Sequence, residues 1–134
     1  MAGDFTTVYV VEGDISVKNL PEHIFGSKIK RYAKGLRLEV PAQAGVYPVE
    51  FAPTIDVELF GVHIGCSGYS DKDYWELIIG EEPEPTLETI YTKELHEEHG
   101  LAVTVVPANT RILINFHNIS ETSKIVYFDL IMKK

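Results

Sequence analysis

The sequence predicts an all-β domain, an antiparallel β-sandwich of jelly-roll type with seven or eight strands and at most one short helix. Three observations predict this class. Short segments rich in β-branched and aromatic residues recur along the chain, and turn residues separate them roughly every 8–12 residues. The pattern lacks the long helical crossovers that parallel strands require. At 134 residues, 45% of them hydrophobic, the chain is large enough to bury one core.

The N-terminal third differs from the rest of the chain. We expect residues 1–35 to form an arm or edge segment and residues 36–134 to form the sandwich. The run Val8-Tyr9-Val10-Val11 indicates an edge strand or an arm that pairs with another chain. The best helix candidate is Leu20–Tyr32, although Gly26 weakens it. A basic cluster lies at the end of this third, and its members are Lys28, Lys30, Arg31, Lys34 and Arg37.

The first predicted strand of the sandwich is Leu36–Val40, where apolar and charged residues alternate with period 2. Pro41 and Gly45 then indicate a turn. In the next run, Ile55, Val57 and Leu59 share one face, and the apolar phase shifts by one residue across Gly61. We interpret this shift as a β-bulge, because glycine tolerates the kink that a bulge needs.

Five further strands follow, and polar or Gly/Pro-containing turns separate them. Their predicted ranges are Tyr74–Ile79, Leu87–Thr92, Leu101–Val106, Ile112–His117 and Ile125–Met132. We expect the last two to pair as a hairpin at the centre of a sheet. The final strand is apolar on both faces, which predicts a second sheet on one side and a neighbouring subunit on the other. A homo-oligomer is therefore expected.

Charge is distributed unevenly. The net charge is −8, but residues 1–40 carry six Lys and Arg against five acids, whereas residues 41–134 carry six against fifteen. An acidic body repels phosphates, so nucleic acid is not an expected partner.

No apolar run is long enough to cross a bilayer, so no membrane association is expected. Cys66 is the only cysteine, which excludes an intrachain disulfide and suits a reducing compartment.

Two motifs invite a metal, and both have a simpler interpretation. His96-Glu97-Glu98-His99 is not the HExxH arrangement, because its histidines are three residues apart and Gly100 follows. We predict a solvated acidic turn there. Asp71 and Asp73 have the spacing that opens a calcium loop, but Lys72 and the following aromatic residues do not fit one. We predict a polar loop whose aspartates bond to local backbone.

The chain shows no catalytic signature. It has no Gly-x-Ser-x-Gly motif, and Cys66 ends an apolar strand, where a cysteine usually behaves as a small buried hydrophobe. The five histidines form no recognisable ligand or base constellation in the sequence; they are His23, His63, His96, His99 and His117. We therefore expect a protein that is not an enzyme and holds no catalytic residues, cofactor or metal.

The aromatic residues support a different kind of function. Tyr69, Tyr74 and Trp75 lie near predicted loops and strand ends, where they could form a ligand platform that stacks on sugars. This arrangement would make the protein a carbohydrate-binding module of jelly-roll type. The alternative is that Trp75 and Tyr91 belong to the core or its rim. A metal-dependent enzyme of the cupin type is a third hypothesis, and no set of convergent ligands supports it.

A family resemblance favours another function. Asp73-Tyr74-Trp75-Glu76-Leu77, the segment from Glu88 to Leu95, and the stretch from Phe116 to Asp129 resemble small β-sandwich structural proteins of tailed bacteriophages and prophages of Gram-positive bacteria. The resemblance covers roughly residues 55–134. It implies a virion component made in the host cytoplasm, such as a capsid decoration or head-fibre protein, or a tail or baseplate subunit.

If the protein is a virion component, the features of its own sequence predict how it would dock. The N-terminal arm and the basic cluster would anchor to an acidic lattice, and the C-terminal sheet would carry the contacts between subunits. Other virion proteins are then the expected partners, with host-surface carbohydrate as an additional one.

Overall fold

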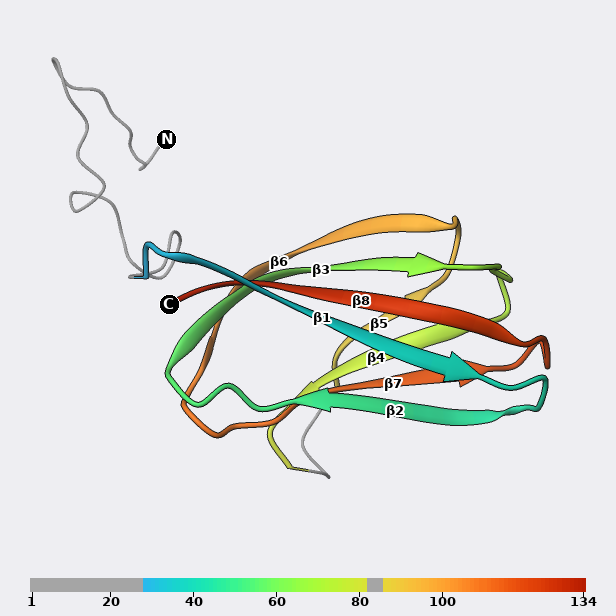
Figure 1. Cartoon of the computed structure of the whole chain (residues 1–134), viewed down its shortest axis with the longest axis horizontal. Coiled ribbons are helices and arrows are strands. Elements are labelled where there is room, and N and C mark those ends of the chain that lie inside the picture. Colours follow the sequence, from blue (N-terminus) through green and yellow to red (C-terminus); the bar gives the residue numbers. More distant parts are fainter. Residues whose placement is uncertain (1–27, 82–85) are drawn as a thin grey trace, which may run out of the picture.

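The computed structural model describes residues 28–81 and 86–134, which form eight β-strands and no helix (Figure 1). All paired strands run antiparallel. The predicted fold class is therefore confirmed. The strands are β1 (Arg31–Val40), β2 (Gly45–Phe51), β3 (Val57–Cys66), β4 (Tyr74–Ile79), β5 (Thr86–Tyr91), β6 (His96–Val106), β7 (Ile112–Asn118) and β8 (Lys124–Lys133).

The strands build two four-stranded sheets. One sheet has the order β1-β8-β3-β6 and the other has the order β2-β7-β4-β5. Most connections cross from one sheet to the other, and only β4 and β5 are consecutive strands that pair as neighbours. Eight strands joined in this way make a sandwich of jelly-roll type. Its open edges are β1 and β6 in the first sheet and β2 and β5 in the second.

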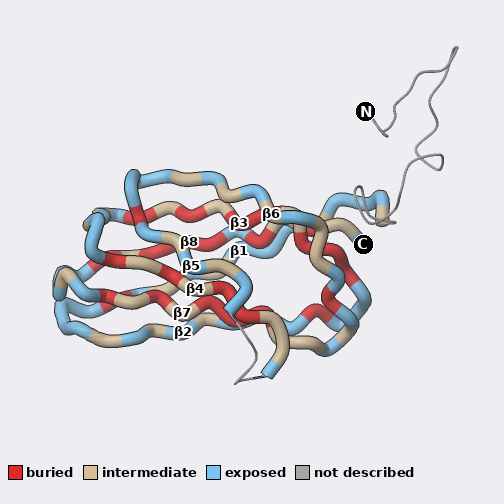
Figure 2. Tube along the Cα trace, turned by 180° about the vertical axis from the view of Figure 1, so that it is seen from behind, coloured by how far each residue is buried: buried red, intermediate tan, exposed pale blue. Residues whose placement is uncertain are grey.

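The core lies between the two sheets. Buried and more exposed residues alternate along the strands, as period-2 geometry requires (Figure 2). Leu59 of β3 and Phe128 of β8 belong to the first sheet, and Trp75 of β4 and Phe116 of β7 belong to the second. All four are fully buried, and the Trp75 and Phe128 rings meet across the core at 5.7 Å between centroids.

The bulge predicted at Gly61 is confirmed. The pairing of β3 with both β6 and β8 shifts register between Leu59 and Gly61. A Cβ atom at position 61 would lie 2.9 Å from the carbonyl oxygen of His99, which is closer than real Cβ contacts come. Glycine is therefore required at this position by backbone packing as well as by the kink.

Two boundaries near the N-terminus were predicted wrongly. β1 begins at Arg31, five residues before the predicted start of the first strand at Leu36, so residues 31–35 form part of an edge strand. Arg31 and Tyr32 are extended, so no helix reaches Tyr32. β2 was missed because Pro48 lies at its centre, and proline is tolerated on an edge strand such as this one. Residues 8–11 and most of the predicted helix lie outside the described residues.

The predicted C-terminal hairpin is also wrong. β7 pairs with β2 and β4, whereas β8 pairs with β1 and β3, so the segment between them crosses from one sheet to the other. The alternation of apolar and polar residues along each strand is the same for a hairpin within one sheet and for a crossover between two sheets. The sequence pattern therefore could not distinguish these two arrangements. The inward residues of β8 are buried, but Tyr127 and Asp129 on its outer face are exposed in the described chain.

Candidate docking site

The predicted basic cluster lies on and beside β1, at an open edge of the first sheet. Lys30, Arg31, Lys34 and Arg37 are exposed. Lys28 is half-buried, and its backbone N–H donates to Glu58 Oε1 at 3.0 Å. The structure thus brings together all five predicted partner-binding residues along one strand and its approach.

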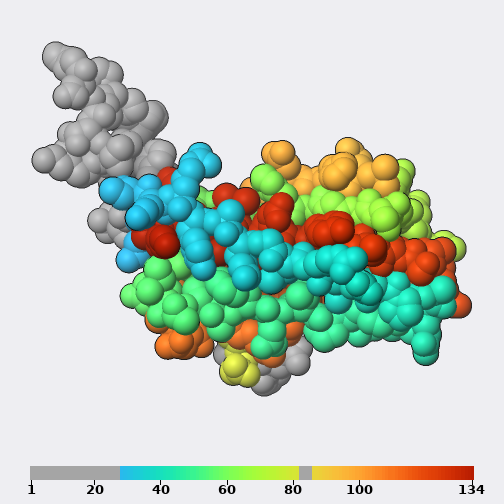
Figure 3. Space-filling view, in the orientation of Figure 1, coloured from blue at the N-terminus to red at the C-terminus, as the bar shows by residue number. Residues whose placement is uncertain are grey.

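Two further lysines join the cluster from the other end of the chain. β1 pairs with β8 so that Arg31 lies opposite Lys133, and Lys30 and Lys134 exchange backbone hydrogen bonds of 3.2 and 2.7 Å. Figure 3 shows the start of β1 and the end of β8 side by side on the surface. We call the combined set the basic edge: Lys28, Lys30, Arg31, Lys34, Arg37, Lys133 and Lys134. Seven of the twelve cationic residues of the chain therefore lie along β1, the residues that precede it and the end of β8 that pairs with it.

Aromatic rings support several of these lysines. The Nζ atom of Lys34 lies 5.3 Å from the Phe51 ring centroid, and those of Lys133 and Lys134 lie 4.7 Å from the rings of Phe60 and Tyr32. Cation–π contacts of this kind orient the ammonium groups without neutralising them. Arg37 differs, because its Nη1 donates to Glu39 Oε2 at 2.6 Å.

The predicted aromatic platform is wrong. Trp75 is fully buried in the core, where the alternative interpretation placed it, so it cannot stack on a ligand at the surface. Tyr74 is half-buried between His117 and Tyr91, with ring centroids 4.2 and 5.1 Å away on the two flanking strands. Tyr69 is half exposed but lies in the loop before β4. The three side chains therefore present no common face.

The segment His96–His99 is not a turn as predicted, because it forms the start of β6. Alternation sends His96 and Glu98 to the outer face and turns Glu97 and His99 inward. Glu97 accepts backbone N–H bonds from Lys93 and Glu94 at 2.6 and 2.9 Å and contacts His99 Nε2 at 3.0 Å. Burial tends to raise the pKa of Glu97, but these bonds outweigh it and lower the pKa. Within residues 28–81 and 86–134, no three His, Cys, Asp or Glu residues are arranged to hold a metal.

Asp73 has a structural role that the sequence did not suggest. Its carboxylate accepts N–H bonds from Ile119 and Ser120 at 2.8 and 2.9 Å and forms a buried ion pair with Lys124. Lys124 Nζ also donates to Asn118 Oδ1 and Ser120 Oγ, both at 3.1 Å. This loop-end network ties the loop before β4 to the loop between β7 and β8. The predicted local bonds of Asp73 are therefore replaced by bonds across 46 to 51 residues.

Cys66 behaves as predicted. It is buried at the end of β3, and burial is the main reason that the pKa of its thiol rises to about 11. The group is a neutral thiol at physiological pH, which makes it a poor nucleophile.

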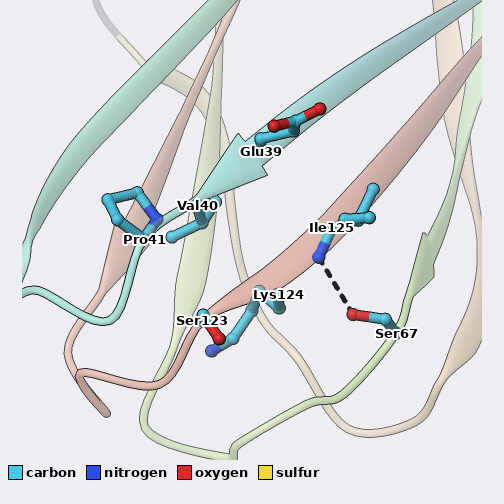
Figure 4. Close-up of a pocket in the computed structure, with 7 residues that line it drawn as sticks. All are labelled: Glu39, Val40, Pro41, Ser67, Ser123, Lys124 and Ile125. Atoms are coloured by element: carbon cyan, nitrogen blue, oxygen red, sulfur yellow. Dashed lines mark hydrogen bonds between the residues drawn. The ribbon is translucent and has the colours of Figure 1, made fainter.

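A surface hollow of about 510 Å³ lies near the loop end of the first sheet (Figure 4). Its lining residues are Glu39, Val40, Pro41, Ser67, Ser123, Lys124 and Ile125. Two of its polar groups are already engaged. Ser67 Oγ accepts the N–H of Ile125 at 2.9 Å, and the Lys124 ammonium is held by the loop-end network. The hollow therefore has little free polar chemistry to offer a ligand.

A second hollow of about 340 Å³ lies on the outer face of the first sheet, over β8, β3 and β6. We call it the outer groove. Its lining residues are His63, Ile64, Gly65, His96, Glu97, Glu98, Tyr127 and Asp129. No local pattern in the sequence indicates this groove, because its residues become neighbours only through the pairing of three strands. Among the described residues, no helix has the length and hydrophobicity needed to cross a membrane.

The fold and surface define a jelly-roll sandwich with seven of the twelve cationic residues of the chain along one edge. A family model described as Domain of unknown function (DUF8551) matches residues 28–134, so the chain belongs to this family. No curated protein sequence matches the chain.

The solved structures to which the chain is similar include two of low sequence identity. One is a chain of "Acidic stable capsid structure of Helicobacter pylori bacteriophage KHP30", with 17% identity and a TM-score of 0.46, covering 79% of this chain and 90% of that one. The other is "CBM4 structure and function", with 12% identity and a TM-score of 0.44, covering 74% and 82%.

Proposed function

We propose that this protein is a non-enzymatic structural subunit of a bacteriophage virion, such as a capsid decoration or head-fibre protein, or a tail or baseplate subunit. It docks on a symmetric particle and acts through its surface. The observation that carries the proposal is the basic edge, which gathers seven cations on a chain whose net charge is −8. Jelly rolls also serve in viral capsids, which supports the proposal by analogy of fold.

The charge distribution gives the docking an orientation. The acidic body is repelled by an acidic lattice, whereas the basic edge is attracted to it, so the molecule approaches with β1 foremost. Most of these side chains are exposed, so their attraction is screened by salt over a Debye length of about 8–10 Å. Attachment should therefore weaken at high ionic strength.

The test is incorporation into particles. Virions purified from cells that produce the full-length protein should contain it at a fixed copy number per particle, as measured by quantitative mass spectrometry. The triple reversal Lys30→Glu, Arg31→Glu and Lys34→Glu should reduce the copy number at least tenfold. Lys72→Glu, which reverses an exposed lysine in the loop before β4, is the matched control and should leave it unchanged.

Absence of the wild-type protein from purified particles would reject the virion role. Undiminished incorporation of the triple variant would reject the basic edge as the docking surface. Each variant should keep the wild-type melting temperature, which separates a docking defect from misfolding.

A further inference from the structure

We propose that the outer groove binds a neutral saccharide, independently of the docking function of the basic edge. The groove is built from two adjacent rows of residues that cross three strands. Tyr127, Gly65 and His96 form one row, and Asp129, His63 and Glu98 form the next. Five of these six positions carry a polar or aromatic side chain on the outer face, and the sixth is a glycine.

Gly65 makes the hollow. It lies between Tyr127 and His96 in its row, so the surface dips where its side chain would stand. A Cβ atom at position 65 would lie 3.2 Å from Nδ1 of His96, which shows that the imidazole leans over the glycine. The walls are therefore the Tyr127 ring on one side and the His96 ring on the other.

Four polar side chains of the groove have no partner within the described residues. Glu97, which also lines it, is already held by the N–H groups of Lys93 and Glu94, and the side chain of Tyr127 lies against that of Arg37. His99 and His117 elsewhere in the sandwich contact Glu97 and Glu76 at 3.0 and 2.6 Å. By contrast, His63, His96, Glu98 and Asp129 make no hydrogen bond or ion pair through their side chains with any other part of residues 28–81 and 86–134. Because they project from paired strands, their positions are fixed more firmly than those of loop residues.

The chemistry of the lining selects the ligand class. Two carboxylates accept hydrogen bonds, and the imidazole nitrogens can donate or accept them, which together suit a ligand with many hydroxyl groups. The Tyr127 side chain is 47% exposed and offers an aromatic surface to the apolar C–H face of a sugar ring. Glu98 and Asp129 disfavour an anionic ligand by repulsion. The volume of about 340 Å³ lies within the range of small-molecule sites.

The proposal is tested by calorimetry on the full-length protein with a panel of neutral oligosaccharides of glucose, mannose, galactose and N-acetylglucosamine. At least one should bind with a Kd below about 1 mM. Tyr127→Ala should weaken that binding at least tenfold, and Gly65→Val should abolish it by filling the groove. A sialylated oligosaccharide, which is anionic, should not bind.

Matched controls are Tyr69→Ala and Tyr91→Ala, which remove tyrosines that are 50% and 53% exposed elsewhere on the surface. Both should bind the oligosaccharide like the wild type. The proposal is overturned if no neutral oligosaccharide binds, or if Tyr127→Ala binds as well as the wild type. The triple reversal of Lys30, Arg31 and Lys34 changes no residue of the groove and should bind the oligosaccharide like the wild type, so failure here is distinct from failure of the virion function.

Discussion

The substitution Lys124→Met should test the loop-end network most directly. The side chains of Lys124 and Asp73 are only 1% and 0% exposed, and the lysine is the one cation that contacts this carboxylate among the described residues. Removing one partner of a buried ion pair typically costs about 3–5 kcal/mol, because the other charge stays buried without compensation. That is a large share of the roughly 5–15 kcal/mol by which a domain is stable.

Urea unfolding provides the assay, with the buried Trp75 as the fluorescent reporter. At an m-value of about 1–3 kcal/mol/M, the midpoint of Lys124→Met should fall by at least about 1 M. The double variant Asp73→Asn/Lys124→Met should recover part of the loss, because the neutral amide can remain near Ser120 without a counter-charge. Lys72→Met, in the neighbouring loop, should change the stability by no more than about 0.5 kcal/mol. A midpoint for Lys124→Met within about 0.3 M of the wild type would refute the reasoning.

The same pair predicts a dependence on pH. Burial on its own raises the pKa of Asp73, but the hydrogen bonds from Lys124 and Ser120 outweigh it, so the pKa lies below its ordinary value. A depressed pKa in the folded state contributes stability that is present above the unfolded value of about 3.9 and is lost as the pH falls through the folded value. The urea midpoint should therefore fall more steeply below about pH 4 in the wild type than in Asp73→Asn. Equal slopes for the two proteins would contradict this assignment.

Three further predictions concern the core and its edges. Gly61→Ala should destabilise the protein by about 1–3 kcal/mol, because the new Cβ would meet the His99 carbonyl oxygen at 2.9 Å. Gly100→Ala is the control and should cost less, because a Cβ there would have no atom within 4 Å. The melting temperatures of the two variants measure the difference, and equal losses would rule out the contact as the cause. Cys66 should react with a thiol reagent at pH 8 only after unfolding, because its thiol is buried and burial raises its pKa to about 11. Rapid labelling of the native protein would contradict this prediction. The fluorescence of the buried Trp75 should have its maximum at short wavelength, resist quenching by acrylamide and show no shift when a saccharide binds. A red-shifted emission that acrylamide quenches readily would place Trp75 at the surface.

Part of the candidate docking site could be predicted from the sequence. The cluster from Lys28 to Arg37 is visible as a local run, and β1 keeps it on one strand. Lys133 and Lys134 could not be assigned to it, because they lie about a hundred residues away and join it only through the pairing of β1 with β8. The outer groove could not be predicted either, since its two rows contain residues from three strands that are not consecutive in the chain.

The sequence by itself determined the all-β class, the bulge at Gly61 and the burial of Cys66. Each depends on a local signal: period-2 alternation, a phase shift at a glycine, or the end of an apolar run. Tertiary structure alone decided that β7 and β8 lie in different sheets, that Trp75 is in the core, and that Asp73 meets Lys124. The physical reason is that the alternation of apolar and polar residues shows only which residues share a face of a strand. Which strand pairs with it, and which sheet covers that face, depend on the packing of the whole chain.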